Sequence, residues 1–340
     1  TGGGKTLAGF LPSLIDLANH DGKPPAGLHT LYISPLKALS VDVARNLEAP
    51  AVEMALPISI ETRTGDTPQS KRVRQRRKPP HILLTTPESL ALLLSYADAP
   101  RMFGKLQAVI IDELHALADN KRGEMLALGL ARLATLAPNH RRIGLSATVA
   151  DPPALAKWLS KTAGRADDVS LVVGKAGAAP DINVIHAKAR VPWSGHMAMH
   201  AMPDVYEALK TAESAIVFVN TRAQAEMAFQ ALWRLNEDHL AIALHHGSLA
   251  VEQRRKVEAA MAAGKLRAVI ATSSLDLGID WGNVDLVVQV GAPKGAARLL
   301  QRIGRANHRL DAPSRALLTP GNRFELLECR AAIEAAEAGE

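Results

Sequence analysis

Short apolar runs alternate with longer amphipathic helical stretches over the whole chain, and this alternation constrains the fold more than any other feature. The strand candidates lie at 30–34, 58–62, 82–85, 108–111, 142–146, 183–186, 215–219, 241–244, 268–271 and 286–290. Helical patterns fall between most of them, for example at 123–137, 222–235 and 251–263. Strands that are apolar along their whole length are typical of parallel sheets covered on both faces. We therefore expect an α/β fold with mainly parallel sheets.

The chain changes character in the middle. Between residues 167 and 203, glycine, proline and histidine accumulate and the helical period is lost. A chain of 340 residues usually holds about two domains. We expect a first domain at 1–165, a boundary or linker region at 166–202, and a second domain at 203–340 with its own core.

The composition is that of a globular protein and argues against a disordered chain, because 47% of the residues are hydrophobic. No uncharged apolar run reaches the roughly 18 residues of a membrane span, so no membrane partner is expected. The N-terminus shows no signal peptide, and the single Cys329 cannot form an internal disulfide. We therefore expect a cytoplasmic location. The net charge of +6 favours a polyanionic partner only mildly.

A glycine-rich turn opens the chain and leads directly into an apolar helical stretch. Its residues are Thr1, Gly2, Gly3, Gly4, Lys5 and Thr6. Consecutive glycines let backbone N–H groups point at a phosphate, and the positive end of the following helix adds to the same site. Lys5 can reach the outer phosphates, and the Thr6 hydroxyl can ligate Mg²⁺. The usual pattern starts with a further Gly or Ala, so we expect the chain to begin inside this loop.

Two acidic residues, Asp112 and Glu113, directly follow the strand candidate at 108–111. Ligands of parallel sheets bind at the carboxyl ends of the strands, so Asp112 can hold Mg²⁺ and Glu113 can polarise an attacking water. The alternative is that these acids only cap the next helix. This interpretation becomes less favoured when the phosphate loop is expected on the same sheet. Ser146 and Thr148 follow another strand candidate, and their hydroxyls could hydrogen-bond the acidic pair and respond to its state. An ordinary helix cap is the alternative.

Polar segments follow several other strand candidates. At 34–39 and 85–89, free backbone N–H groups and hydroxyls suit contacts with phosphates, although Glu88 is also an ordinary capping acid. In the second half of the chain, polar segments follow strands at 220–222 and 271–281. The segments at 34–39 and 85–89 are therefore candidate phosphate contacts.

Two further segments, 71–78 and 301–309, are dense in cations. On a helix the first would carry charge around most of its circumference, and a nucleic-acid contact and a solvated surface helix both stay open. In the second, Arg302 and Arg305 share one helix face, and their guanidinium groups match phosphate geometry. A basic surface helix is the alternative. The adjacent histidines at 245–246 do not indicate zinc, because neighbouring side chains diverge on a strand.

The order of these motifs resembles the core of a superfamily 2 helicase. The blocks that carry the resemblance are 4–6, 35–39, 86–88, 112–115, 146–148, 218–222, 272–280 and 301–305. The sequences of these blocks most resemble those of the Lhr (large helicase-related) group of DExH-box helicases and, within it, the bacterial DNA-ligase-associated DExH helicases. The resemblance implies two tandem RecA-like domains, each a mainly parallel sheet flanked by helices. It also implies that ATP and Mg²⁺ bind between these domains.

The resemblance assigns catalytic roles to individual residues. The residues implied to bind the nucleotide are Thr1, Gly2, Gly3, Gly4, Lys5, Thr6, Gly278 and Asp280. Thr6 and Asp112 would hold the metal and Glu113 would orient water. Arg305 would be the arginine finger, with Arg302 beside it on the phosphates. The residues implied to couple hydrolysis to motion are Ser146, Thr148 and Gln301.

The resemblance also implies a nucleic-acid partner and a biological setting. The residues implied to contact the strand backbone are Pro35, Lys37, Arg63, Gly65, Thr86, Pro87, Asn220, Thr221, Arg222, Gly247 and Thr272. The function implied is an ATP-dependent 3′-to-5′ translocase or helicase core in DNA repair. It would act on single-stranded or tailed duplex DNA, or on a DNA–RNA hybrid. We expect a nucleoid-associated monomer that works with DNA ligase or nuclease partners.

Two departures from the family pattern limit these expectations. Asn307 and His308 stand where the last block commonly ends in Gly-Arg, so His308 or Arg309 would have to supply a second finger. The chain also ends before the winged-helix domains of the group, so duplex unwinding by this chain is doubtful. An ATP-gated clamp or remodeller and an RNA helicase are the alternatives.

Tryptophans are a further class of candidate nucleic-acid contact. The four in the chain are Trp158, Trp193, Trp233 and Trp281. Each could stack on a base, and Trp281 is the best placed because it follows the polar segment at 271–281. Packing in a core or an interface is the more common fate of a tryptophan.

Overall fold

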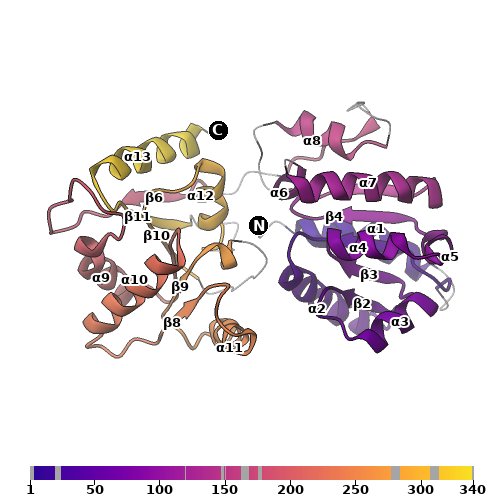
Figure 1. The fold of residues 1–340 in the computed structure, drawn as a ribbon, viewed down its shortest axis with the longest axis horizontal. Helices are drawn as coiled ribbons and strands as arrows, with labels where there is room; N and C mark the ends of the chain where they lie inside the picture. Colours follow the sequence, from indigo (N-terminus) through magenta and orange to yellow (C-terminus); the bar gives the residue numbers. More distant parts are fainter. Residues whose placement is uncertain are drawn as a thin grey trace. The chain divides into compact units, whose positions relative to one another are not determined.

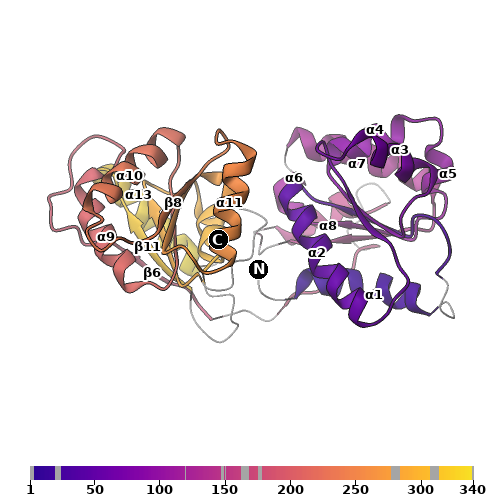
Figure 2. The same ribbon diagram turned by 90° about the horizontal axis from the view of Figure 1, so that it is seen from below.

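The computed structural model describes residues 4–19, 24–118, 120–146, 149, 151–161, 168–174, 178–276, 284–306 and 314–338. They fall into two compact units, an N-terminal unit at Gly4–Val173 and a C-terminal unit that holds Gly174–Glu340 (Figures 1 and 2). Each unit is an α/β domain built on its own parallel sheet, as the alternating pattern predicts.

The N-terminal unit contains a five-stranded sheet in the order β2-β3-β1-β4-β5. Its strands are β1 (Thr30–Ile33), β2 (Ile60–Arg63), β3 (Ile82–Thr85), β4 (Ala108–Ile111) and β5 (Arg141–Gly144). All neighbouring pairs are parallel, and β1, β3 and β4 are buried along their whole length. Ile33 pairs with Thr85 on one side and with Ile111 on the other. The residues that follow these strands therefore emerge side by side at one edge, the carboxyl edge.

Helices cover both faces of this sheet (Figure 2). They are α1 (Lys5–Ala18), α2 (Lys37–Glu53), α3 (Gln69–Arg77), α4 (Pro87–Ser95), α5 (Ala99–Phe103), α6 (Leu114–Ala118), α7 (Lys121–Leu136) and α8 (Pro152–Leu159). Alternate strand residues feed two separate cores. Tyr32 packs with α1 and α2 on one face, while Leu31 and Ile33 belong to the core with α4 and α7 on the other.

The C-terminal unit contains a six-stranded parallel sheet in the order β6-β11-β10-β7-β9-β8. Its strands are β6 (Asp181–Val184), β7 (Ala215–Phe218), β8 (Ile242–His245), β9 (Ala268–Ala271), β10 (Leu286–Val290) and β11 (Arg315–Thr319). β6 falls within the stretch expected to be a linker, yet it pairs with β11 in the second sheet. β11 was not among the expected strands, and it carries an exposed arginine at its start.

Helices also cover both faces of the second sheet, over two separate hydrophobic cores. They are α9 (Met202–Thr211), α10 (Arg222–Leu235), α11 (Val251–Ala262), α12 (Ala296–Ile303) and α13 (Arg323–Ala338), with short 3₁₀ turns η2 (Met199–Ala201) and η3 (Ser273–Leu275). None of the helices in the described part of the chain has both the length and the apolar surface that crossing a membrane requires.

Candidate active site

The described glycine of the glycine-rich turn is its last, directly before α1. Gly4 precedes the helix with φ of 65° and ψ of 12°, a left-handed conformation that favours glycine. The ammonium of Lys5 donates to the backbone carbonyl of Ser146, at 2.9 Å. Thr6, in the same first turn, is half-buried. Lys5 and Ser146, which lies two residues beyond β5, therefore meet at the carboxyl edge of the first sheet.

The acidic pair lies at the same edge, directly after β4. Asp112 is almost fully buried, and its Oδ2 accepts a short hydrogen bond from the Tyr32 hydroxyl. Its Oδ1 accepts from the backbone N–H of Glu113, at 2.8 Å. Burial, reinforced by the Asp112 carboxylate, raises the pKa of Tyr32 far above its usual range, so this hydroxyl stays a neutral donor. Asp112 is thereby held in one orientation.

Glu113 adopts φ of 49°, a left-handed backbone that residues other than glycine rarely take. Strained backbone of this kind is concentrated at functional sites, where the surrounding structure maintains it. The conformation turns the chain sharply between β4 and α6. Ala55, Ala198 and His239 also adopt a positive φ, so it is the place of Glu113 at the carboxyl edge that gives its conformation meaning.

His115 connects the acidic pair to Ser146. Its Nδ1 lies 3.0 Å from Ser146 Oγ, and its Nε2 lies 3.5 Å from Glu113 Oε2. Burial, with the nearby Lys5 ammonium, lowers the pKa of His115, so the ring is neutral near neutral pH. Lys5, Glu113, His115 and Ser146 thus form one connected group. Sequence reasoning assigned no role to His115 or Tyr32, and only the family block at 112–115 drew attention to the histidine.

Several predicted site residues lie outside the described part of the chain. They are Thr1, Gly2, Gly3, Thr148, Gly278, Asp280, Asn307, His308 and Arg309. Their roles stay predictions.

The two arginines predicted to reach the phosphates are buried within the C-terminal unit. Arg302, near the end of α12, donates from Nε to Asp276 Oδ1 at 2.8 Å and from Nη1 to Gln289 Oε1 at 2.5 Å. Its guanidinium lies 4.8 Å from the centre of the Phe218 ring. Arg305 follows in the turn after α12 and is 5% exposed, while Gln301 is half-buried. Arg302 therefore anchors α12 to the segment that contains Asp276.

The predicted strand contacts of the N-terminal unit share its carboxyl edge. They follow β1, end or follow β2, and follow β3: Pro35, Lys37, Arg63, Gly65, Thr86 and Pro87. Because β2, β3 and β1 are neighbours, these residues form one row. Lys37 is exposed and lies 2.9 Å from Asp66. Pro35 accepts a hydrogen bond on its carbonyl from Arg122, at 2.8 Å.

Arg63 is a charged member of this row whose side chain is buried, whereas Lys37 is exposed. Arg63 is 4% exposed and donates from Nη1 to the Arg72 carbonyl, at 2.9 Å. Burial lowers the pKa of Arg63. Arg72 in turn donates to the carbonyls of Gly65 at 2.6 Å and Thr67 at 2.8 Å. In this structure Arg63 and Arg72 support the turn, and Gly65 is presented by it.

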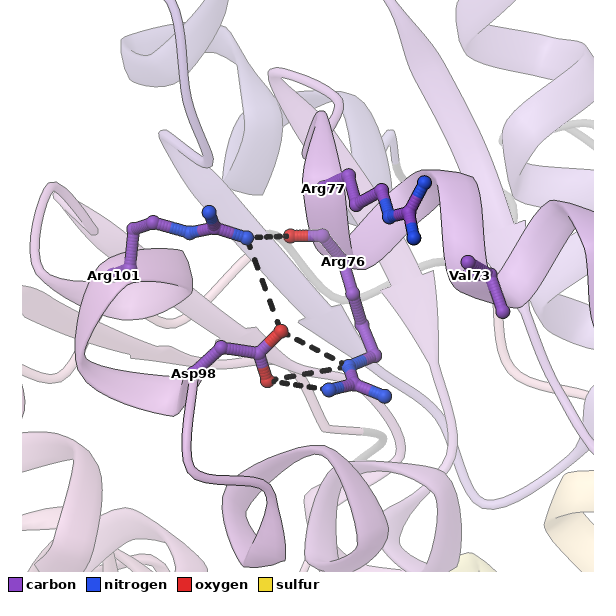
Figure 3. A pocket seen from close by; sticks show the side chains of 5 residues that line it. All are labelled: Val73, Arg76, Arg77, Asp98 and Arg101. Atoms are coloured by element: carbon purple, nitrogen blue, oxygen red, sulfur yellow. Dashed lines mark hydrogen bonds and ion pairs between the residues drawn. The ribbon is translucent and has the colours of Figure 1, made fainter.

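The basic run at 71–78 forms most of α3 and the residue after it, and the ion pairs of its described residues involve Lys71, Arg74 and Arg76, three of its six cations. Arg74 lies 2.7 Å from Glu61, and Arg76 lies 2.9 Å from Asp98. Val73, Arg76, Arg77, Asp98 and Arg101 line an open pocket of about 550 Å³, and in Figure 3 Arg76 and Arg101 point toward Asp98. The ends of α3 and α5 lead into β3 and β4, so this pocket lies at the amino ends of the strands. It is distinct from the motif edge.

The predicted contacts of the C-terminal unit also share one edge. Asn220, Thr221 and Arg222 follow β7, Thr272 follows β9, and Gly247 lies two residues beyond β8. These three strands are neighbours in the order β7-β9-β8. Open space surrounds the position of a Cβ on Gly247, so a strand backbone could approach it closely.

Local contacts hold this second edge in place. Thr221 forms a capping box with Gln224 at the start of α10, and Asn220 donates from Nδ2 to the Ala292 carbonyl at 2.8 Å. Arg222 is exposed and pairs with Glu226 at 2.8 Å. The neighbouring His245 is buried between Ser274 and Glu258, which gives it a structural role.

Comparisons with known proteins agree with this layout. The model of the DEAD/DEAH box helicase family matches residues 1–155, and that of the helicase conserved C-terminal domain matches residues 198–309. The Lhr helicase/probable uracil glycosylase of Mycolicibacterium smegmatis is 39% identical to this chain and aligns with 100% of it and 25% of that protein. The chain belongs to the Lhr-type superfamily 2 helicases.

Two further members of the Lhr group are similar over nearly the whole chain. ATP-dependent helicase Lhr-Core protein 2 of Thermococcus barophilus is 37% identical, over 97% of this chain and 40% of that protein. The structure of Mycobacterium smegmatis helicase Lhr bound to ssDNA and AMP-PNP matches with a TM-score of 0.85 and 40% identity, over 99% of this chain and 45% of that chain. This Lhr-type chain thus spans less than half the length of these relatives. Its two domains are RecA-like and of the type found in ATP-hydrolysing helicases.

Proposed function

We propose that this Lhr-type core hydrolyses ATP when it binds single-stranded DNA and uses the cycle to move along the strand from 3′ to 5′. The observation that carries the proposal is the connected group at the carboxyl edge of the first sheet. There Lys5, Glu113, His115 and Ser146 are joined by contacts of 2.9 to 3.5 Å. The relative from Mycobacterium smegmatis, which shares this fold, was solved with ssDNA and AMP-PNP.

The residues fit a magnesium ion as well as a nucleotide. Mg²⁺ prefers oxygen ligands, and the Thr6 hydroxyl and the Asp112 carboxylate supply them at one edge. Tyr32 holds that carboxylate in place. When bound, the ion would neutralise charge on the phosphates of ATP.

The chain's own residues supply the rest of the chemistry. The Lys5 ammonium, now on the Ser146 carbonyl, would exchange that partner for the outer phosphates. Glu113 would orient the attacking water, because its left-handed backbone holds the carboxylate at the end of β4. His115 contacts both Glu113 and Ser146, so a change in the position of Glu113 would be transmitted to Ser146. This contact gives Ser146 a route to the coupling role proposed for it.

The finer features of the proposal come from the family resemblance. We include among them the roles of Thr148, Gly278, Asp280 and Gln301, the arginine finger Arg305, and the 3′-to-5′ direction. The DNA-repair setting, the ligase or nuclease partners and the nucleoid association have the same support. Contacts to phosphates alone carry no sequence information, so we expect sequence-tolerant binding that weakens steeply with salt.

ATP hydrolysis measured with ssDNA, with ssRNA and without polynucleotide tests this proposal. Stimulation by ssDNA above that by ssRNA is the expected result, and turnover that no polynucleotide alters would contradict it. A strand-displacement assay on a 3′-tailed duplex, run beside a translocation assay, addresses the alternative. ATPase stimulation with neither movement nor displacement would favour the ATP-gated clamp.

A further inference from the structure

A segment between β6 and α9 crosses the carboxyl edge of the second sheet and carries an exposed tryptophan. We name this segment, residues 191–196, the Trp193 loop. Arg323, at the start of α13, donates from its backbone N–H to the Pro192 carbonyl at 3.0 Å. Asn322 donates from Nδ2 to the Gly195 carbonyl at 2.7 Å. Since α13 follows β11 closely, the loop lies over the carboxyl end of that strand.

Trp193 is placed as a platform rather than as a core residue. Its side chain is 65% exposed, although burying an aromatic ring of this size would normally stabilise a fold. The Arg323 guanidinium lies 4.1 Å from the centre of the ring. One face of the indole is thus covered by a cation that fixes its orientation, and most of the remaining surface is open to solvent.

Polar contacts to the buried Glu325 carboxylate hold the loop, although the His196 side chain itself is exposed. His196 Nδ1 lies 2.6 Å from Glu325 Oε1. The other oxygen of this buried carboxylate accepts from the backbone N–H of Gly321, at 2.8 Å, and of Ala292, at 3.3 Å. A Cβ on Gly321 would lie 3.0 Å from the His196 backbone, so the two segments approach closely. The loop is therefore preorganised, which lowers the entropy cost of a contact made through it.

The same network joins the loop to the predicted nucleic-acid contacts. Gln224 donates from Nε2 to the His196 carbonyl at 2.5 Å, and its Oε1 accepts from the backbone N–H of Asn220 at 2.9 Å. Asn220 donates from its side chain to Ala292, which follows β10. The strand order β11-β10-β7-β9-β8 then places Trp193, Asn220, Thr272 and Gly247 along one edge. A strand that follows this edge past Asn220 reaches the Trp193 loop.

We propose that Trp193, backed by Arg323, stacks on one base of the bound single strand. Aromatic rings bind bases of any sequence in this way, because every base has a π face. The other contacts on this edge would hold phosphates, so Trp193 would add a base contact to a row of backbone contacts. The inference rests on the proposed function, since it needs a single strand on this edge.

Trp233 provides a matched control. It is 58% exposed and lies in the same unit, where its ring stacks on Phe229 with centroids 5.7 Å apart. It stands near the C-terminal end of α10, the helix that follows β7, and so at the opposite edge of the sheet. The two tryptophans thus match in exposure and differ in position.

The test compares W193A, W193F and W233A in the protein by fluorescence anisotropy. The probes are a fluorescein-labelled oligo(dT) 20-mer and an abasic strand of the same length. We expect W193A to bind oligo(dT) roughly 10-fold more weakly, W193F to recover most of the affinity, and W233A to match the wild type. All variants should bind the abasic strand equally, because stacking needs a base.

A second measurement does not depend on W193A being stably folded. Stacking quenches indole fluorescence, so oligo(dT) should quench the wild type and W233F more than W193F. Equal quenching in W193F, unchanged oligo(dT) affinity in W193A, or an equal loss on the abasic strand would each overturn the stacking role. A wild type that binds neither probe would overturn the proposed function together with this inference. A wild type that binds while Trp193 proves neutral would overturn this inference alone.

Discussion

The carboxyl edges of the two sheets are both formed by the ends of parallel strands, but their buried charged side chains have different partners. At the first edge, Asp112 receives hydrogen bonds from a neutral tyrosine hydroxyl and a backbone N–H, and among the described residues no cation forms an ion pair with it. At the second edge, the Arg302 guanidinium is already neutralised by Asp276 and held by Gln289. The first edge is thus prepared for a cation from outside, whereas Arg302 has its anion within its own unit.

This difference separates the roles of the two arginines in the last motif. Breaking a buried, hydrogen-bonded ion pair costs about 3–5 kcal/mol, because one charge is left without a partner. Arg302 would have to lose Asp276 before it could reach a phosphate. Arg305 is buried as well and has an interaction of its own, but it lies in the turn beyond α12, and the family resemblance assigns the finger role to it. We therefore expect Arg305 to serve catalysis and Arg302 to serve mainly the architecture of the second edge.

The largest expected effect concerns Arg305. R305A should lower the polynucleotide-stimulated kcat by roughly 10³–10⁵-fold, the range found for arginine fingers, and leave ATP binding largely intact. Steady-state turnover and the binding of a fluorescent ATP analogue measure the two quantities. A turnover within about threefold of the wild type would remove Arg305 from the catalytic centre and end the proposed division of roles.

The acidic edge is tested next, through Glu113. E113Q should lower kcat by about 10²–10⁴-fold, since the amide cannot polarise water as the carboxylate does. D98N is the matched control, because Asp98 is an acidic residue of the same unit at the opposite edge. Equal losses in E113Q and D98N would show that the effect is a general loss of negative charge.

The ion pair of the second edge should determine stability more than turnover. R302M, which preserves much of the side-chain volume, should lower the free energy of unfolding by up to about 3–5 kcal/mol, because buried Asp276 loses its main partner and keeps only the half-exposed Arg298, at 3.6 Å. Chemical denaturation followed by far-UV circular dichroism measures this. The double variant R302M/D276N should recover part of the loss. A normal stability combined with lost turnover would instead assign Arg302 to catalysis.

The smallest effect is a pH dependence of stability at the first edge. Burial and Lys5 lower the pKa of His115 in the folded protein below the unfolded value of about 6.5. The unfolded chain then binds more protons in this range, so stability is complete above about pH 6.5 and falls as the pH drops toward the lowered value. H115N should show a shallower loss between pH 7 and pH 5 than the wild type. An identical slope in both would mean that other histidines control the transition.

Much of the fold follows from local patterns in the chain. β3, β4, β9 and β10 occur where uninterrupted apolar runs predict them, because a strand covered on both faces needs no polar alternation. β11 escaped prediction because it begins with an arginine and is too short to stand out from a helical run. Its partners β10 and β6 are distant in the chain, and only their pairing makes it a strand.

The candidate site was predictable in the same partial way. The motif residues could be assigned to one edge of each sheet because parallel strands bring their carboxyl ends together. The burial of each side chain and the partners it contacts could not be predicted from the sequence. Arg63 proved to be buried under its turn, and half of the cations of the basic run at 71–78 proved to be paired with Glu61 and Asp98. Trp281, the preferred stacking candidate, lies outside the described residues and stays a prediction, while the structure draws attention to Trp193.

The amino-acid order alone determined the two-sheet α/β class, the positions of the strand ends and the set of charged groups near them. These features depend on residues close together in the chain, whose periodicity and spacing can be read directly. The tertiary structure alone decided which charges face outward and which are already satisfied. Arg302 with Asp276, and Trp193 with Arg323, join residues separated by tens of residues or more, and packing of distant elements brings each pair together.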